Sequence, residues 1–576
     1  MRLAAEPQVL LLTYVQYYLT LRVVWNRGLD AADGGGEAGR SAPLETLTSQ
    51  ATPPSATWRS RPLPEPSRTL RRWLSPLALA LALGGVYGAT LLPGAGYSPD
   101  TAEFQFSGHL LCVTHPTGYP AYLLLNYAFS RLAPIGSVAF RANLFSAICS
   151  VLACLVIRRL LQRLGARDAI ATASSLALGF TPTFWRLSVV AEVYSLHALL
   201  LALVAHGLLR WRQTRERRAL IVACGLYVFS FGNHLTSITL LPAVAFIVIA
   251  THGRVLFDRR SAAPVAGLIT LGLLPYAYPI WRSLDPTTPY VSVPVTNLAE
   301  LWGYATGAMF RGAMFPFTPA QLLFERVPLF ARHWWADCGV LLPLAALGVV
   351  GLKDRVAGAF LGLIFLGQLA FALNYDIADI DVYLIPVYII TGVAAGLGLE
   401  WLFSRRWVHR VPAVACFALP LVLCLLHWDR VEVAKGADKA QPMREIVTAT
   451  RDRALIIARY NDFMYLLYYT LAERLGGPSL FLGTEIPLEE IVAYVGQDRP
   501  VYLAHTRQWA PPGLPVYCTY LSLRPALRAA GLQLKVVRPG VFQIDRNHGI
   551  STAPMAQAVY EDGSGAPRPG EAQADQ

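Results

Sequence analysis

Charged residues are scarce in this 576-residue sequence, in which Asp, Glu, Lys and Arg together make up only 15%. A soluble globular domain usually carries about 25% charged residues. Hydrophobic residues reach 54%, and the mean hydropathy is +0.41. The low charge content excludes an ordinary soluble protein and indicates a polytopic membrane protein, because long apolar segments leave little room for charge.

Other chemical signatures are also missing. The eight cysteines contain no CxxC pair and lie mostly inside apolar runs, so no zinc site, redox motif or disulfide framework is predicted. No phosphate-binding glycine loop is present in the C-terminal part. No Asp-x-Asp motif lies near a cytoplasmic glycine-rich fold of the kind that nucleotide-sugar enzymes use. The apolar run 9–24 lacks a small-residue cleavage site, so it is a poor signal peptide; it is interpreted as an interfacial helix or a product of start-codon choice.

The net charge of +12 does not indicate a nucleic-acid partner, because the basic residues do not gather on one soluble segment. They occur in short clusters between apolar runs, which is the pattern of cytoplasmic loops in membrane proteins. These clusters include Arg158-Arg159, Arg215 to Arg218, Arg259-Arg260 and Arg405-Arg406.

Charge clusters and apolar runs together predict eleven membrane spans, with the N-terminus in the cytoplasm and the C-terminus outside. The segment 119–132 is only 14 residues long and is opened by prolines. A crossing there would put the arginines after 157 outside, so a juxtamembrane or re-entrant helix is predicted instead. The predicted spans are 73–92, 144–161, 169–184, 190–211, 219–231, 235–251, 264–280, 338–352, 358–373, 382–403 and 411–426, with a long outer loop at 281–337.

Four regions follow from this topology. Residues 1–72 are predicted to be cytoplasmic and mostly disordered, since they are rich in Gly, Ala, Pro and Ser without periodicity. Residues 73–427 form a helical membrane domain with a first outer loop at 93–143. Residues 428–551 read as a small extracytoplasmic α/β domain, with strands at 454–459, 479–482 and 501–505 and a hairpin around Pro539-Gly540. Residues 552–576 are predicted to be a disordered tail.

The first outer loop has an unusual polar content for a segment bounded by spans. It holds Asp100, Glu103, His109 and His115, and no Lys or Arg precedes Arg131. Two acids three residues apart share one face of a helix. An acid pair beside interface-type sequence is where a membrane enzyme could keep a base near a lipid-borne substrate; the alternative is a solvated surface loop.

Further polar residues are predicted at the same outer level, at the ends of several spans. Glu192 lies among apolar residues, where an unpartnered carboxylate costs a few kcal/mol. For His234 and His206, the alternative to ligand binding is a histidine that is hydrogen-bonded between helices. The other residues at this level are Tyr194, His197, Asn233, Arg282, Asp285 and the group Asp376, Asp379 and Asp381, which has the alternative of a solvated turn.

Three motifs resemble a known family. Asp100-Thr-Ala-Glu103, His115-Pro-Thr-Gly-Tyr-Pro120 and Arg141-Ala-Asn-Leu-Phe-Ser146 are similar to the signature of the domain-of-unknown-function 2723 group. That group includes the eukaryotic transmembrane protein 260 O-mannosyltransferases. The blocks Ala191-Glu-Val-Tyr-Ser-Leu-His197 and Gly232-Asn-His-Leu-Thr236 resemble two further family blocks. The likeness is close over residues 73–300 and loose over 300–550. Pro99 and Ala102 replace family glycines and Thr117 replaces a proline, so the chain departs from the family pattern around Asp100.

This resemblance implies a GT-C glycosyltransferase, a multispan enzyme with an acid in its first outer loop and a polyprenyl-phosphate sugar, here a mannose donor, as co-substrate. It implies that Asp100 is the general base of an inverting transfer to an extracytoplasmic hydroxyl of a protein or a glycolipid. Glu103 would orient the acceptor or share the base role. No metal or other cofactor is expected, since a lipid-phosphate donor does not require one. The residues expected to bind donor or acceptor are His115, Tyr119, Arg141, Glu192, Tyr194, His234 and Arg282, with Arg141 alternatively anchoring the loop through its carboxylates.

Two other function classes are weighed against the enzyme. A transporter or flippase would show inverted repeats and acids at the bilayer midplane, whereas these acids lie at span ends. A non-catalytic scaffold would use its C-terminal domain to bind partners and would not need Asp100. The predicted location is a multi-pass membrane protein, in the plasma membrane if the source is bacterial, and acceptor docking is the hypothesis for the C-terminal domain.

Overall fold

The computed structural model describes residues 68–405 continuously and, beyond them, 413–431, 440–449, 454–458, 460–475, 479–482, 488–497, 499–504, 527–538 and 541–546. The predicted disorder at 1–67 and 552–576 therefore lies outside the described residues. The chain divides into two units, Met1–Ala78 and Leu79–Gln576. The helix α2 (Arg68–Thr90) begins in the first unit and ends in the second.

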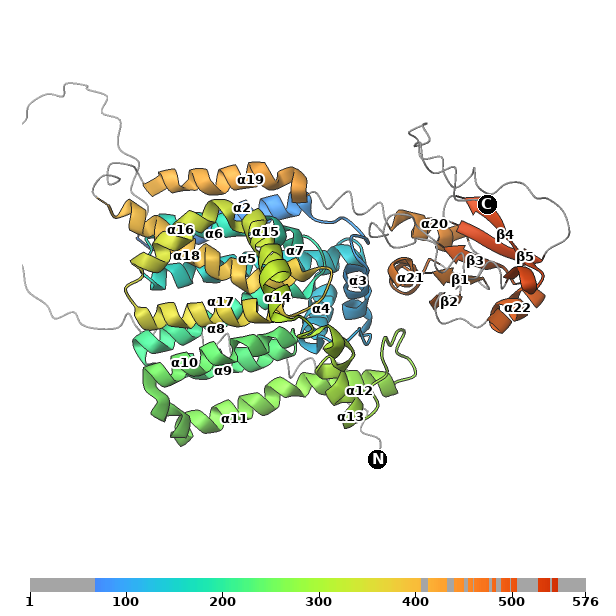
Figure 1. Cartoon of the computed structure of the whole chain (residues 1–576), viewed down its shortest axis with the longest axis horizontal. Helices are drawn as coiled ribbons and strands as arrows, with labels where there is room; N and C mark the ends of the chain where they lie inside the picture. The colour runs from blue at the N-terminus through green and yellow to red at the C-terminus, as the bar shows by residue number, and fades with distance from the viewer. Residues whose placement is uncertain are drawn as a thin grey trace, which may run out of the picture. The chain divides into compact units, whose positions relative to one another are not determined.

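Most of the described chain is a bundle of long apolar helices that run side by side (Figure 1). They bury small and aliphatic side chains against one another, as helices in a lipid environment do. The bundle consists of α2 (Arg68–Thr90), α5 (Val138–Arg163), α6 (Asp168–Gly179), α7 (Pro182–Ser188), α8 (Val193–Thr214), α9 (Arg217–Phe231), α10 (Leu241–His252), α11 (Arg259–Leu273), α15 (Val327–Cys338), α16 (Leu342–Gly351), α17 (Arg355–Leu373), α18 (Ile385–Phe403) and α19 (Ala418–Val431).

Nine helical segments among the described residues are long and apolar enough to cross a membrane. They coincide with nine of the eleven predicted spans. The predicted spans 169–184 and 219–231 correspond to shorter helices. Helix α6 ends at Gly179 and continues after a break as α7, and α9 has 15 residues. The segment predicted to be juxtamembrane forms the 13-residue helix α4 (Pro120–Leu132) and is not among the nine.

The outer loop predicted at 281–337 is wrong in its second half. One candidate span runs without interruption from Pro319 to Gly351, through the charged residues Glu325 and Arg326. The guanidinium of Arg326 is buried and donates to the backbone carbonyls of Leu373, Ala372 and Tyr375. Because its hydrogen bonds are satisfied inside the protein, this charge does not end the helical run.

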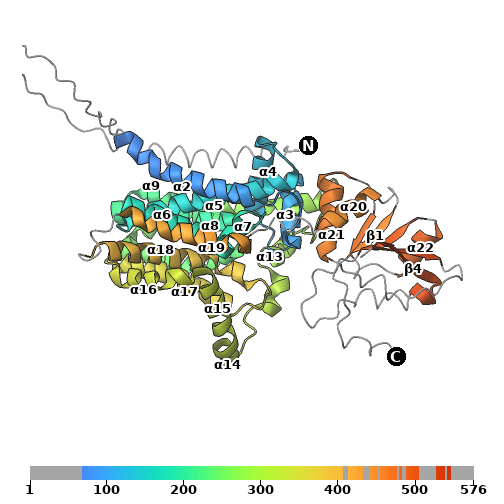
Figure 2. The same ribbon diagram turned by 90° about the horizontal axis from the view of Figure 1, so that it is seen from above.

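Several short elements lie at one end of the bundle (Figures 1 and 2). They include α3 (Pro99–Leu110), α4, α12 (Ala277–Leu284) and α13 (Leu298–Ala305). Helix α3 packs against α4 and α5. Its chain leaves through Leu111, which has a left-handed φ of 55° and closes the helix with backbone hydrogen bonds. This reversal brings the segment after α3 back alongside it.

The C-terminal region contains a five-stranded sheet in the order β2-β1-β3-β5-β4. β1 (Leu455–Ala458) pairs in parallel with β2 (Ser479–Leu482) and β3 (Val501–Ala504), with Ile456 opposite Leu480 and Tyr502. β5 (Val541–Arg546) pairs antiparallel with β3 and with β4 (Leu532–Arg538). The helices α20 (Gln441–Ala449), α21 (Tyr460–Leu467) and α22 (Leu488–Gly496) complete the region. The α/β character, the three strands and the antiparallel pairing of the two hairpin strands are confirmed, and the turn expected at Pro539-Gly540 lies outside the described residues.

This region shares a hydrophobic core with α3. Ala102 and Phe106 of α3 lie in one buried cluster with Met443, Tyr465 and other side chains of the C-terminal region. The backbone N–H of Ala139 donates to the hydroxyl of Tyr468 at 3.1 Å. The helix that carries Asp100 and Glu103 is therefore packed on both sides, by the bundle and by the α/β region.

Candidate active site

Asp100 stands in the first turn of α3. The side chain of Ser98 caps this helix by accepting the backbone N–H of Thr101 at 3.0 Å, and Pro99 occupies the first helical position. Proline fits there because the missing N–H has no partner in the first turn. The replacement of a family glycine by Pro99 is thus compatible with a helical start. Asp100 is half-buried and lies at the positive end of the helix, which favours a carboxylate.

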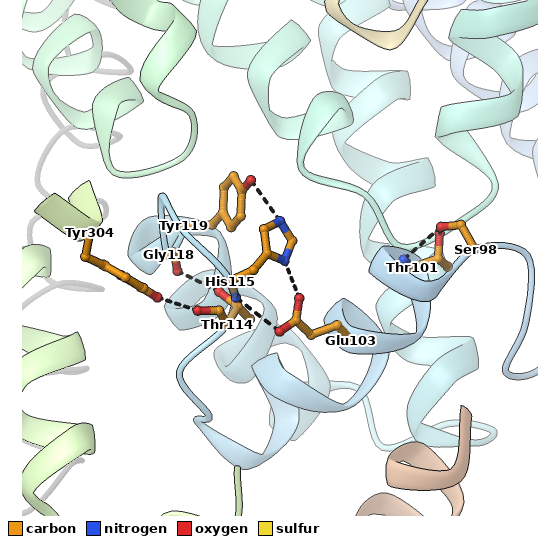
Figure 3. A network of polar contacts seen from close by, with 8 residues as sticks. All are labelled: Ser98, Thr101, Glu103, Thr114, His115, Gly118, Tyr119 and Tyr304. Carbon is orange, nitrogen blue, oxygen red and sulfur yellow. Dashed lines mark hydrogen bonds and ion pairs between the residues drawn. The ribbon is translucent and has the colours of Figure 1, made fainter. Parts of the chain in front are cut away.

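Glu103, one turn further on, is fully buried and holds His115 (Figure 3). Its Oε1 accepts the backbone N–H of His115 at 3.1 Å, and its Oε2 forms an ion pair with His115 Nδ1. The other ring nitrogen, Nε2, is 3.1 Å from the hydroxyl of Tyr119. Two residues predicted to bind substrate, His115 and Tyr119, are therefore joined to Glu103 in one hydrogen-bonded chain.

The pairing keeps His115 protonated. Burial lowers the pKa of its imidazole, but the charge of Glu103 and the hydrogen bond to it outweigh this effect and raise the pKa to about 9. Asp100 and Glu192 act in the same direction. The site thus contains a cation, His115, that the sequence alone could not distinguish from a neutral histidine.

Glu192 is connected to α3 directly. Glu192 lies directly before the first residue of α8, and its Oε1 accepts a hydrogen bond from the hydroxyl of Thr101 at 2.8 Å. Burial, and next the nearby charge of Asp100, raise the pKa of Glu192 to about 8. The expectation that Glu192 needs a partner is confirmed, and the carboxyl is mostly protonated at neutral pH.

An aromatic enclosure adjoins the acids. The ring of His234 lies 5.9 Å from that of Tyr119, 5.3 Å from Tyr194 and 5.6 Å from Tyr383, measured between centroids. His234 Nδ1 accepts the backbone N–H of Thr236 at 3.3 Å. The structure therefore brings together Tyr119, Tyr194 and His234, as the sequence predicted, and adds Tyr383, which it did not.

Arg186 is a further polar residue that the sequence analysis missed. Its guanidinium donates to Tyr97 Oη at 3.0 Å and forms an ion pair with Asp381. Asp381 is thus tied to Arg186, whereas Asp376 and Asp379 are exposed, as the alternative of a solvated turn predicts. Arg186 lies just beyond the predicted span 169–184, and the sequence alone does not show which residues an isolated arginine contacts.

Two predicted ligands are used for structure instead. Arg282 is buried; its Nε donates to the backbone carbonyl of Leu111 at 2.7 Å, and its Nη1 pairs with Asp285. It therefore holds the end of α3. Arg141 donates to the carbonyls of Ser130 and Ser137 and makes no bond to the acids of the first loop, so its alternative role of anchoring their carboxylates is wrong. It fastens the turn between α4 and α5.

The segment between Leu111 and Pro120 is held closely from one side. The hydroxyl of Tyr304 donates to the carbonyl of Thr114 at 2.6 Å (Figure 3). Gly118 has a φ of +86°, and a Cβ built there would stand 2.3 Å from Cε1 of Tyr304. Only glycine satisfies both the backbone conformation and the space at this position. This contact fixes the loop that carries His115.

Asp100, Glu103 and His115 also form a group whose ligand atoms lie within 4.8 Å of one another, close enough to hold a cation. The atoms of Glu103 and His115 that could bind a metal already have hydrogen-bond partners, however. Both Glu103 oxygens bind His115, and both ring nitrogens of His115 have partners. A cation would have to displace these contacts, and Asp100 alone could offer a ligand without such a loss.

Comparisons with known proteins agree with this geometry. Residues 100–256 match the family model of the protein O-mannosyl-transferase TMEM260 N-terminal domain. A protein O-mannosyl-transferase TMEM260 of Mus musculus is 29% identical over 216 residues, which are 35% of this chain and 29% of the relative. A tmem260 protein of the same description from Dictyostelium discoideum is 21% identical over 407 residues, 60% of this chain and 48% of the relative. The chain thus matches less than half the length of either relative.

The fold is that of a solved membrane protein. ArnT from Cupriavidus metallidurans, in its crystal structure bound to undecaprenyl phosphate, superposes with a TM-score of 0.54 at 15% sequence identity. The match covers 82% of this chain and 98% of ArnT. The chain is therefore a polytopic membrane protein that shares the fold of ArnT, and its residues 100–256 match the model of the TMEM260 N-terminal domain, in agreement with the resemblance of its motifs.

Proposed function

We propose that this protein is an inverting membrane glycosyltransferase that moves a sugar from a polyprenyl-phosphate donor to an extracytoplasmic hydroxyl group. The names of the matched relatives favour mannose as the sugar and a protein Ser or Thr as the acceptor. The ligand named for ArnT favours a polyprenyl-phosphate donor. In this proposal the acid-bearing end of the bundle and the α/β domain face the extracytoplasmic side, and the N-terminus is cytoplasmic.

The observation that carries the proposal is the difference between the two acids of α3. Glu103 is fully buried and both its oxygens bind His115. Asp100 is half-exposed, and its carboxylate has no hydrogen bond or ion pair with any residue that the structure describes. A general base needs an unoccupied oxygen within hydrogen-bond reach of the acceptor. Asp100 meets this requirement, and Glu103 acts as a positioning residue.

The reaction follows from this assignment. Asp100 takes the proton of the acceptor hydroxyl while the oxygen of that hydroxyl attacks the anomeric carbon of the donor. The bond between that carbon and the phosphate oxygen breaks, and polyprenyl phosphate leaves with the bonding electrons. Attack on the side opposite the leaving group inverts the configuration at the anomeric carbon. The protonated Asp100 then returns its proton to solvent.

The leaving phosphate needs cationic or hydrogen-bonding partners. The side chain of Arg186 is 28% exposed, whereas that of Arg282 is 9% exposed, so Arg186 replaces Arg282 as the arginine proposed to contact the phosphate. His234 and the surrounding tyrosines offer hydrogen-bonding groups and flat aromatic faces for the sugar. The protonated His115 supplies a further positive charge beside Asp100.

We expect the transfer to need no metal ion, because the donor atoms of Glu103 and His115 already have partners. The proposed activity is tested with purified protein in lipid vesicles, supplied with radiolabelled polyprenyl-phosphate mannose and a Ser/Thr peptide. The expected product is an α-linked mannosyl peptide from a β-linked donor, formed equally with and without EDTA. If the protein consumed none of a panel of polyprenyl-phosphate sugars, the proposal would be contradicted. Retention of the configuration at the anomeric carbon would contradict the single-step reaction.

A further inference from the structure

A second polar site lies on the lipid-facing side of the bundle, between the α15–α16 connection and α19. A cavity of about 510 Å³ opens there. Leu341, Leu423 and Leu426 contribute apolar walls, and His427 and Arg430 of α19 contribute polar groups at one end. The cavity thus has an apolar body and a cationic end, which is the shape and polarity of a lipid with a charged headgroup.

The polar end is oriented by hydrogen bonds to neighbouring helices. His427 is buried, and its Nδ1 is 2.8 Å from the backbone carbonyl of Phe180. The carbonyl accepts a hydrogen bond, so Nδ1 carries the proton and Nε2 is left as an acceptor for a donor group of a ligand. Asp337 also lines the cavity, but its two oxygens accept the backbone N–H and the hydroxyl of Thr183 at 2.7 and 2.9 Å. Its charge is therefore turned toward α7.

Arg430 supplies the net charge of this end. Its side chain is exposed and forms no hydrogen bond or ion pair with any described residue. Its neighbour Asp429 is not among the cavity-lining residues. Asp337, the acid that does line the cavity, is occupied by Thr183. An anionic group of a ligand would therefore meet Arg430 without a competing acid from the lining.

Two tryptophans indicate the depth of the cavity in the membrane. Trp335 lines the cavity and is 68% exposed, and Trp428, on the same helix as His427 and Arg430, is 38% exposed. Tryptophan is enriched at the boundary between the hydrocarbon and the headgroups. Arg430 follows Trp428 by two residues at the end of α19, so its guanidinium lies at headgroup depth. The leucines lie deeper, where acyl chains run.

We propose that this cavity binds an anionic phospholipid, with the headgroup phosphate on Arg430, a headgroup hydroxyl donating to Nε2 of His427, and an acyl chain along Leu341, Leu423 and Leu426. The lipid would join α19 to the α15–α16 connection across α7. Helix α7 is the element that also carries Arg186 of the candidate active site. Bound lipid therefore stabilises the segment that positions Arg186.

The experiment compares purified full-length protein in nanodiscs of phosphatidylcholine with and without phosphatidylglycerol. Native mass spectrometry counts retained phosphatidylglycerol, and thermal unfolding reports stability. The expected result is retention of one phosphatidylglycerol per protein and a higher Tm with that lipid. Arg430→Gln should weaken its binding about fivefold, the effect of one basic side chain near a charged headgroup. Arg430→Glu should abolish the Tm increase, and Arg430 is exposed, so both variants should fold.

Arg355→Glu is the matched control. Arg355 is an exposed arginine lining a second groove of about 540 Å³, between α16, α17 and α18, and the change should leave phosphatidylglycerol retention and the Tm increase intact. Equal retention by wild type and Arg430→Glu would overturn the proposal, as would equal stabilisation by phosphatidylcholine alone. Displacement of phosphatidylglycerol by an equal amount of undecaprenyl phosphate would also overturn it and would assign the cavity to a polyprenyl lipid. These readouts do not depend on transferase activity.

Discussion

Glu103 and His115 form a buried ion pair in which both carboxylate oxygens bind the same residue, one through the backbone N–H and one through the ring. Glu103 therefore positions His115, and Asp100 is the carboxylate of α3 that remains available to a substrate. The ion pair also connects α3 to the loop in front of α4, so one ion pair contributes both to the site and to the fold of the first outer loop.

The ion pair predicts a pH-dependent stability. The pKa of His115 is raised to about 9, above the value of about 6.5 in an unfolded chain. Its contribution is therefore fully present below pH 6.5 and is lost as the pH rises through 9. Thermal unfolding in detergent should show a Tm that falls between pH 7 and 10. Glu103→Gln should lower the Tm at pH 7 and flatten this fall; an unchanged slope would contradict the pairing.

Glu192 predicts a second dependence in a lower pH range. Its folded pKa is raised to about 8, whereas an unfolded glutamate titrates near 4.3. The folded state therefore binds more protons between these values, and the contribution of Glu192 to stability decreases with rising pH in that window. Glu192→Gln should gain stability relative to wild type from pH 5 to pH 8, measured as the difference in Tm. A constant difference would mean that Glu192 is ionised in the fold.

Gly118 is predicted to be intolerant of a side chain for two separate reasons, its φ of +86° and its contact with Tyr304. Gly165→Ala is the matched control, because Gly165 has a φ of +104° and open space around it. The control should lose only the backbone preference, about 1–2 kcal/mol. Gly118→Ala should lose clearly more, measured by thermal unfolding. Equal losses would show that Tyr304 moves aside without cost.

Arg186 and Arg282 should differ in the quantity that they affect. Arg186→Gln removes the proposed phosphate contact, so kcat/KM for the donor should fall about tenfold or more, the value of a charged hydrogen bond, with little change in Tm. Arg282→Lys should lower the Tm, since it loosens the end of α3. Arg212→Gln, which breaks a partly buried pair with Asp354 at the C-terminal end of α8, controls for loss of an arginine. An unchanged kcat/KM for the donor in Arg186→Gln would exclude the contact.

The sequence predicted the parts of the site that depend on local spacing. Asp100 and Glu103 do share α3, and Glu192 and His234 do reach the same end of the bundle. It could not predict which acid is free, because the contact of Glu103 with His115 depends on the chain reversal at Leu111. That reversal uses a left-handed leucine, for which no local pattern exists.

The errors concern arginines, whose long side chains reach distant partners. Arg326 was counted as a loop charge, although three carbonyls satisfy it inside a span. Arg282 was expected at the phosphate because of its level in the membrane, but Leu111 and Asp285 occupy its guanidinium. Arg186 was overlooked at the end of a span. Topology rules place such charges by depth and say nothing of their partners.

The most direct test of the proposed mechanism is Asp100→Asn, which keeps the size of the side chain and removes the base. Reconstituted variant and wild type would be compared for mannosyl transfer from the polyprenyl-phosphate donor, with donor binding and Tm measured on the same samples. The account predicts that kcat falls at least a hundredfold, while donor binding and Tm stay within error of wild type. Transfer at the wild-type rate by Asp100→Asn would contradict the assignment of Asp100 as the base.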